Sequence, residues 1–144
     1  MENELIKSLV SIVAFFNRTD RDKKFVKAAG IDLEATSFQL FVTIGRMQPT
    51  NVSDLANIMG KSHSSVSRQI DKLENSGLIV TRNAEKDARI RTIQLSKQGT
   101  ELTQTIDITR LKEIKNIMSS WSDEEKKSLL VNLQHLARTL NSLE

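Results

Sequence analysis

The sequence contains no cysteine. This absence excludes a disulfide framework, a thiolate metal site and a switch based on cysteine oxidation. No apolar run approaches the length that a helix needs to cross a bilayer. The N-terminal segment MENELIKSLV begins with acidic residues instead of the basic region of a secretory signal. We therefore expect a cytoplasmic protein without a membrane partner.

The sequence also lacks the patterns that indicate catalysis. It has no Gly-rich phosphate loop, no paired acid and base, and no ligand spacing typical of a metal site. The two histidines, His63 and His135, are far apart and belong to no carboxylate or cysteine pattern. We expect no metal, no cofactor and no catalytic residue, and an enzyme is the weakest hypothesis.

The length and composition indicate one ordered domain spanning residues 1–144. A chain of this length buries roughly two-thirds of its unfolded surface. The net charge of +3 is concentrated in one segment, because residues 61–97 carry eight basic and four acidic side chains while the flanking segments are nearly balanced. A local basic excess favours a polyanionic partner, and a solvated charged face is the alternative.

Helical spacing of apolar residues begins at the N-terminus. Residues 2–17 carry two adjoining apolar stripes, which predict a helix that is buried on more than one side. The interleaved charges of residues 18–27 indicate a solvated turn of helix. The segment TSFQLFVTIGRM predicts a second helix that ends before Pro49.

Two further helices follow in close succession. NVSDLANIMG predicts a short helix with Asn51 as N-cap, Asp54 at N3 and Gly60 as its C-terminal stop. The next helix begins in SHSSVSRQ with Ser62 as N-cap and is closed by Gly77. Its apolar stripe consists only of Val66, Ile70 and Leu73. The side chains opposite or beside that stripe are Ser64, Ser65, Arg68, Asp71, Lys72 and Asn75.

The next two segments predict a β-hairpin. LIVTR and RIRTIQL are rich in β-branched residues, alternate in polarity and are separated by NAEKDA. The halves next to this loop carry Arg82, Arg89 and Arg91, so we expect the tip to project beyond the core.

Two helices complete the chain. The first spans about residues 97–120, and the second begins at SDEE, a capping box with Ser122 as N-cap and Glu125 at N3. In the second helix leucines are spaced by four, three, four and three residues, which is a coiled-coil seam: Leu129, Leu133, Leu136, Leu140 and Leu143. The seam favours packing against a second chain, and an intramolecular helix pair is the alternative.

This order of elements predicts a winged helix-turn-helix. In such a unit the second helix lies in the major groove with its N-terminal residues at the base edges. Small hydroxyl side chains permit close approach of the helix to DNA, and one arginine can donate two hydrogen bonds to guanine O6 and N7. The N-terminus of the helix favours binding of a phosphate. For Arg68 the alternative is a solvated helix charge, and the individual serines are undecided.

The chain resembles the multiple-antibiotic-resistance regulators, the MarR family. The resemblance is carried by residues 52–99, which contain Leu55-Ala56, the serine-rich SHSSVSR, LENSGL, Arg82 after the first strand, the wing sequence Asp87-Ala88-Arg89 and LSKQG. The flanking helices are also similar, so the likeness covers nearly the whole chain.

The resemblance implies a homodimeric, sequence-specific DNA-binding regulator, more often a repressor, on a pseudo-palindromic operator. It implies that Arg89 enters the minor groove and that Asp87 orients it. It also implies a small aromatic or other small-molecule effector that releases the DNA. The chain departs from the family in having D-A-R where many members have two arginines, and Ser96 where threonine is usual.

These features predict a mainly α fold with a small β-hairpin wing, in which dimerisation helices flank the winged helix-turn-helix. The DNA-binding lobe is expected at 33–99, and the dimerisation region at 1–30 and 100–144. Expected DNA contacts in the recognition helix are Ser62, Ser64, Ser65, Ser67, Arg68 and Lys72. Those in the wing are Arg82, Lys86, Asp87, Arg89 and Arg91. Expected dimer contacts are Leu5, Leu9, Leu129, Leu133, Leu136 and Leu140. The alternative function is a winged-helix module that binds protein and does not read DNA sequence.

Overall fold

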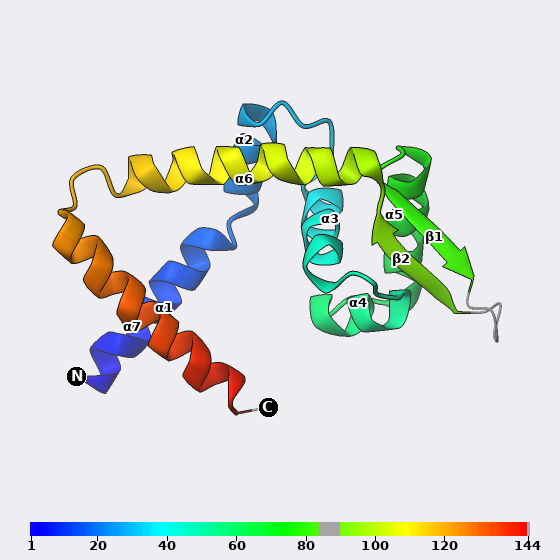
Figure 1. Ribbon diagram of the computed structural model, residues 1–144. Helices are drawn as coiled ribbons and strands as arrows, with labels where there is room; N and C mark the ends of the chain where they lie inside the picture. Colours follow the sequence, from blue (N-terminus) through cyan, green and yellow to red (C-terminus); the bar gives the residue numbers. More distant parts are fainter. Residues whose placement is uncertain (84–89, 144) are drawn as a thin grey trace. The chain divides into compact units, whose positions relative to one another are not determined.

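The computed structural model describes residues 1–83 and 90–143, apart from the side chains of residues 19, 20 and 22. The chain divides into two compact units, Met1–Thr109 and Arg110–Glu144. Figure 1 shows the elements of the first unit, with α6 continuing into the second. They are α1 (Glu2–Phe16), α2 (Thr19–Ala28), α3 (Ala35–Met47), α4 (Val52–Met59), α5 (His63–Asn75), β1 (Ile79–Asn83), β2 (Arg91–Leu95) and the first part of α6 (Lys97–Ile117).

The second unit contains the remainder of α6 and the helix α7 (Asp123–Asn141). The chain is thus mainly helical, with one two-stranded antiparallel sheet in its described part. This architecture confirms the predicted fold class. No helix in the described ranges combines the length and the apolar character needed to cross a membrane.

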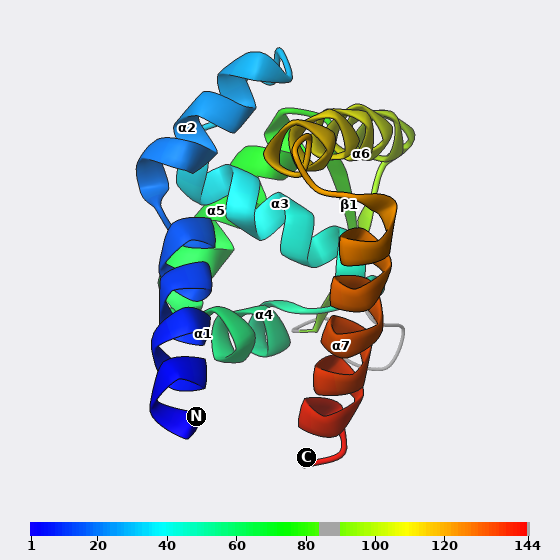
Figure 2. The same cartoon turned by 90° about the vertical axis from the view of Figure 1, so that its left-hand side faces the viewer.

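The core of the first unit lies where α3, α4, α5 and the hairpin meet. Phe41 and Ile44 of α3, Leu55 of α4, Ile70 of α5 and Ile93 of β2 are all completely buried. Figure 2 shows α4 below α3, as Figure 1 does. These buried side chains come from every helix of the predicted helix-turn-helix and from its hairpin, so one core holds the lobe together.

The segment after α1 is a longer and more buried helix than its sequence predicted. The interleaved charges of residues 18–27 indicated a solvated turn of helix, whereas the structure has the ten-residue helix α2 there. Val26 is buried in the core, and the rings of Phe25 and Phe38 lie 5.5 Å apart between centroids. The many charges of the segment obscured these two apolar anchors.

The predicted helix ends of α4 and α5 are confirmed. The Asn51 side chain accepts a hydrogen bond from the backbone N–H of Asp54 at 2.8 Å, and Gly60 ends α4 with a φ of 62°. The Ser62 hydroxyl accepts from the backbone N–H of Ser65 at 3.2 Å. Helix α5 ends at Asn75, two residues before Gly77, whose φ is 79°. A left-handed conformation of this kind favours glycine.

The hairpin register determines which side chains face the lobe. Ile79 pairs with Leu95, Thr81 with Ile93, and Asn83 with Arg91. Directly paired residues lie on the same face of a sheet, and side chains alternate between faces along a strand. Since Ile93 is completely buried, its face, which includes Thr81 and Arg91, is the one that meets the lobe. A bridge between Thr50 and Ile93 adds a third segment beside β2.

The capping box of α7 is also confirmed. The Ser122 hydroxyl accepts from the backbone N–H of Glu125 at 3.1 Å, and the Glu125 carboxylate accepts from the backbone N–H of Ser122 at 3.0 Å. The Ser122 backbone N–H and then its side chain lower the pKa of Glu125. A depressed carboxyl pKa stabilises the helix start above the unfolded-state pKa, and this contribution is lost as the pH falls through the folded pKa.

Helix α1 has no buried residue in the single chain. Leu5, Ile6, Val10 and Phe16 are each more than half exposed. The predicted burial on more than one side therefore does not occur within one chain. Helix α7 likewise has no buried residue.

Candidate nucleic-acid interface

Helix α5 combines a narrow buried stripe with a polar outer face. Val66, Ile70 and Leu73 are at most 2% exposed and attach the helix to the lobe. Ser64 and Arg68 lie one turn apart on the outer face, where the Arg68 Nε donates to the Ser64 carbonyl oxygen at 3.4 Å. This bond directs the Nε side of the Arg68 guanidinium along the helix surface toward the N-terminus of α5.

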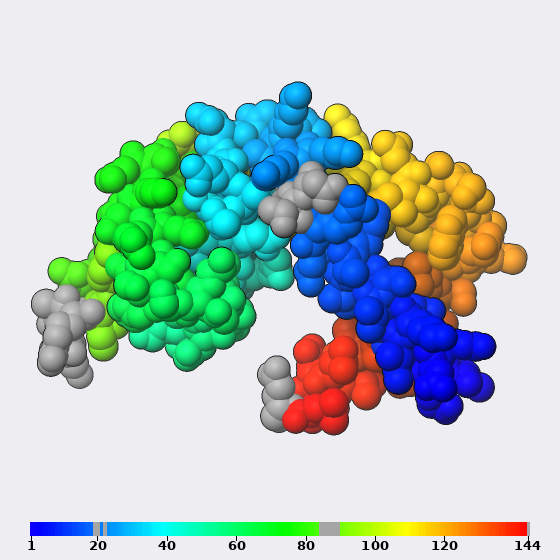
Figure 3. All heavy atoms as spheres, turned by 180° about the vertical axis from the view of Figure 1, so that it is seen from behind, coloured from blue at the N-terminus to red at the C-terminus, as the bar shows by residue number. Residues whose placement is uncertain are grey.

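The structure brings most of the predicted recognition-helix residues to the surface. Ser62, Ser64, Arg68 and Lys72 are exposed, whereas Ser65 and Ser67 are half-buried. In the space-filling view of Figure 3, α4 and α5 form one continuous surface. Exposure permits contact with a partner and does not by itself assign one, so these DNA contacts stay predictions.

A cavity of about 290 Å³ lies where the starts of α4 and α5 meet the start of β2. Its lining includes Ser53, His63 and Ser67 together with Arg91. Helix N-termini present free backbone N–H groups and the positive end of the helix dipole, which favour an anion. This hollow is therefore suited to approach by a phosphate group, although Asp54 also lines it and opposes a negative charge.

The predicted wing residues fall into two groups. Lys86, Asp87 and Arg89 lie outside the described residues. Arg82 is exposed and pairs with Thr92, so it lies on the hairpin face opposite to that of Ile93 and Arg91. The two described wing arginines therefore point to different sides of the hairpin.

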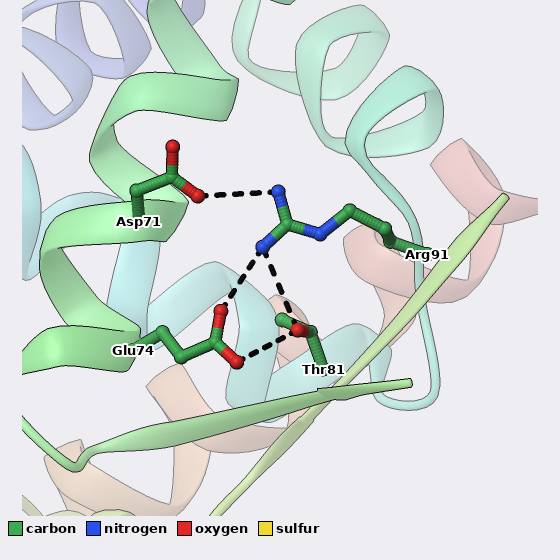
Figure 4. A network of polar contacts seen from close by, with 4 residues as sticks. All are labelled: Asp71, Glu74, Thr81 and Arg91. Carbon is green, nitrogen blue, oxygen red and sulfur yellow. Dashed lines mark hydrogen bonds and ion pairs between the residues drawn. The ribbon is translucent and has the colours of Figure 1, made fainter. Parts of the chain in front are cut away.

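Arg91 contacts the recognition helix directly. Its Nη1 lies 3.2 Å from Asp71 Oδ1, and its Nη2 lies 3.0 Å from Glu74 Oε2. The Thr81 hydroxyl donates to Glu74 Oε1 at 2.8 Å, and Arg91 Nη2 donates to the Thr81 hydroxyl at 3.5 Å. Figure 4 shows the guanidinium of Arg91 between the two carboxylates. We call these four residues the hairpin network.

The hairpin network did not emerge from the sequence. The helical pattern placed Asp71 on the outer face of the recognition helix and connected neither it nor Glu74 and Thr81 with Arg91. A signal for the connection exists, because carboxylates three residues apart on a helix lie on one face. An arginine on the lobe side of a neighbouring strand is a suitable partner for such a pair. Along the chain, Arg91 is 17 residues from Glu74 and 20 residues from Asp71, so no local sequence pattern connects it with them.

The predicted dimer contacts are accessible in the single chain. Leu5, Leu9, Leu133 and Leu140 are 41–55% exposed, and Leu129 and Leu136 are half-buried. Isolated exposed apolar residues are ordinary, but whole helices without a buried residue mark surfaces for association. Neither α1 nor α7 has a buried residue in the single chain, and the dimer contacts stay predictions.

A second cavity, of about 440 Å³, lies between residues 30–33 and the first part of α6. Leu33, Leu78 and Leu102 line it, and Asp32 and Glu101 add carboxylates. These carboxylates would repel an aromatic acid. In the described parts of the chain, no three histidine, aspartate or glutamate side chains are grouped to hold a metal ion.

Residues 31–90 match the model of the MarR family. The transcriptional repressor MprA of Escherichia coli strain K12 is 27% identical over 123 residues, which cover 84% of this chain and 69% of that protein. A MarR family protein from Bacillus stearothermophilus has a similar structure, with a TM-score of 0.79, 22% identity, and coverage of 96% of this chain and 94% of that one.

The solved complex of Streptococcus pneumoniae FabT with DNA also has this fold. Its TM-score is 0.65 at 20% identity, covering 99% of this chain and 96% of that one. The family-model match spans α3, α4, α5 and β1, which are the elements that build the polar-faced helix and its support. The chain therefore has the winged helix-turn-helix fold of these structures, and its residues 31–90 are similar to the MarR family.

Proposed function

We propose that this chain is a repressor that binds a pseudo-palindromic operator as a homodimer. The observation that carries the proposal is the contrast within α5, where three buried apolar residues attach a helix whose other side chains are all polar or charged. A helix in this position has a partner outside its own lobe. The FabT complex supports DNA as that partner, because a protein of the same fold binds it.

Within this proposal the recognition helix supplies the base contacts and much of the phosphate contact. Arg68 reads a guanine through O6 and N7, which is the commonest specific contact in the major groove. Lys72, one turn further along the helix, neutralises a phosphate. Ser62, Ser64, Ser65 and Ser67 permit close approach and donate hydrogen bonds. In the wing, Arg82, Lys86 and Arg89 approach the backbone or the minor groove, with Asp87 orienting Arg89.

The homodimer joins two such lobes. Residues 33–99 form the DNA-binding lobe of one MarR-like domain, and residues 1–30 and 100–144 form the dimerisation region. The exposed apolar surfaces of α1 and α7 support this assignment. Two identical reading helices require half-sites related by a two-fold axis, about one helical turn of DNA apart.

The cell compartment and the effector belong to the same proposal. A DNA target agrees with a cytoplasmic protein. A small aromatic or other small molecule would release the operator by changing the separation of the two reading helices. The cavity that Asp32 and Glu101 line is a poor site for an aromatic acid, so we assign no residues to the effector.

Selection from a random pool of DNA duplexes tests the central claim. We expect the wild-type chain to enrich a two-fold symmetric sequence and to bind it with an affinity that falls steeply as salt rises. Arg68→Ala should cost about 1–3 kcal/mol per half-site and relax one base position of the enriched sequence. Lys72→Ala should weaken all sequences similarly and flatten the salt dependence.

Lys24→Ala is the matched control, since it removes an exposed positive charge from α2. We expect it to leave the enriched sequence and the base preferences unchanged. An unchanged sequence after Arg68→Ala would contradict its role as a base reader. Failure to enrich any sequence would favour the alternative, a winged-helix module that binds protein.

A further inference from the structure

We propose that Arg91 is a positioning residue that holds the hairpin against the recognition helix, and that its guanidinium does not contact DNA. This inference rests on the proposed function for its consequence in DNA binding. The contact between Arg91 and the recognition helix exists in the free protein and can be tested without DNA. The sequence predicted a DNA contact for Arg91 because it lies in the basic segment, and this inference replaces that role.

The guanidinium of Arg91 is placed to join two elements. Its Nη1 and Nη2 are directed to two different carboxylates, those of Asp71 and Glu74, at 3.2 and 3.0 Å. Both carboxylates come from α5, whereas Arg91 comes from β2. A planar guanidinium with fixed donor directions is suited to such a bridge and loses little freedom for each bond formed. The Arg91 side chain is only 28% exposed, although it lies near the hairpin tip.

The bridge lies toward the outer end of the hairpin. Among the described residues, Asn83 and Arg91 form the outermost pair of the ladder, and Ile93 of the next inner non-adjacent pair, Thr81 and Ile93, is completely buried in the core. A two-stranded ribbon is only marginally stable by itself, so its direction depends on contacts with the rest of the lobe. Because the Thr81 hydroxyl also bonds to Glu74, both strands are connected to α5 at this level.

The charge of the hairpin network keeps Arg91 in place. Asp71 and Glu74 together carry two negative charges, and Arg91 neutralises one. If Arg91 turned toward a phosphate, both carboxylates would remain unpaired on a helix that lies against DNA. Unpaired like charges at such an interface oppose binding. The arrangement in which Arg91 stays on the carboxylates is therefore favoured when DNA is bound as well.

Backbone amide hydrogen exchange of the full-length protein tests the bridge without DNA. We expect Glu74→Gln to accelerate exchange at Arg82 and Thr92, next to the network, by about three- to tenfold, as expected for loss of a partly exposed ion pair. Val80 and Gln94, nearer the core, serve as internal controls and should change little. Equal acceleration at all four amides, or none, would overturn the bridge.

DNA titration of the enriched operator tests the consequence by the sign of the effect. Glu74→Gln makes the lobe more positive, so a purely electrostatic role predicts tighter binding. If the network positions the hairpin, Glu74→Gln should weaken binding by about three- to tenfold. Glu101→Gln is the matched control, because it removes the same charge at the start of α6, and it should not weaken binding.

Arg91→Met completes the test. A phosphate-binding arginine contributes about one counterion to the salt dependence, so its loss would flatten the slope of affinity against salt. We expect Arg91→Met to weaken binding and leave that slope unchanged. The double variant with Glu74→Gln should lose no more affinity than Arg91→Met alone, because the two side chains act through one another. A flattened slope or tighter binding by Glu74→Gln would overturn the proposal.

The two proposals fail in different ways. If the wild-type chain enriches no DNA sequence, the proposed function is wrong, while the exchange rates at Arg82 and Thr92 still decide whether the bridge exists. If the wild type binds an operator and Arg91→Met flattens the salt slope, the proposed function holds and the positioning role is wrong.

Discussion

At the scale of single residues, partners decide what a charge can do. Arg68 and Arg91 are both arginines of the basic segment, and both were predicted to contact DNA. Arg68 is exposed and its Nε bonds to a carbonyl of its own helix, whereas Arg91 bridges two carboxylates. The same side-chain chemistry is therefore proposed to read a base at position 68 and to position the hairpin at position 91.

Thr50 provides a test of a single buried polar atom. Its backbone N–H and carbonyl pair with Ile93 at 3.1 and 2.8 Å, but its buried Oγ1 has no hydrogen-bond partner in the described parts of the chain. A buried hydroxyl without a partner costs free energy, and a valine of similar shape removes that cost. We expect Thr50→Val to raise the free energy of unfolding by about 1 kcal/mol in urea titrations.

Thr43→Val is the control for this substitution. The Thr43 hydroxyl donates to the Gln39 carbonyl at 2.8 Å, so replacing it removes a hydrogen bond. We expect no gain in stability from Thr43→Val. Destabilisation by Thr50→Val would mean that its hydroxyl is hydrogen-bonded in solution.

At the scale of elements, the join between β2 and α6 controls how closely the hairpin and the helix approach. The Ser96 hydroxyl donates to the Gly77 carbonyl at 2.6 Å and accepts from the Gly99 backbone N–H at 3.0 Å. Ser96 thus starts α6 and connects it to the turn before β1. The serine that replaces the usual threonine supplies the hydroxyl that both bonds require.

Gly99 is expected to be indispensable at this join. A Cβ at this position would collide with the Leu78 carbonyl oxygen, which also accepts from the backbone N–H of Ser96. Because a backbone atom cannot move aside as a side chain can, Gly99→Ala should lower the free energy of unfolding by about 1–3 kcal/mol. Chemical denaturation followed by circular dichroism measures this loss.

Gly45→Ala is the matched control within α3. A Cβ there would meet Leu95 Cδ1 at 3.6 Å, an ordinary van der Waals distance. Alanine in a helix interior is favoured over glycine by about 0.5–1 kcal/mol, so this variant should be unchanged or more stable. Similar losses in both variants would show that the close approach at Gly99 is not the cause.

At the scale of the whole molecule, the apolar surfaces of α1 and α7 require a second chain in the proposed function. We expect a dimer at micromolar concentration in light scattering. The double variant Leu133→Asp/Leu140→Asp should be monomeric or unfolded, because it places charges in the predicted seam. Its operator affinity should fall by about 100-fold or more, since the two half-sites are no longer bound by one particle.

Gln134→Asp introduces the same charge on α7 outside the predicted seam and serves as the control. It should remain dimeric and bind DNA as the wild type does. A wild-type chain that is a stable monomer at micromolar concentration would end the dimer proposal, and a dimeric double variant would exclude the seam as the interface.

The sequence by itself determined the features that depend on neighbouring residues. Asn51, Gly60 and Ser62 predicted helix ends that the structure confirms, because a cap involves atoms only a few residues apart. The stripe Val66, Ile70 and Leu73 predicted both the helix and its buried face. The order of these elements was sufficient for the fold class and for the surface of α5.

Only the tertiary structure decided which distant groups meet. Val26 joins the core from a segment dominated by charge, and Gly99 is required by the Leu78 carbonyl, which lies in the turn before β1. Arg91 was grouped with the DNA contacts because its neighbours in the sequence are basic, while its partners Asp71 and Glu74 lie on another element. The free energy of an ion pair depends on distance in space and on burial, and neither quantity is encoded in the local pattern around one residue.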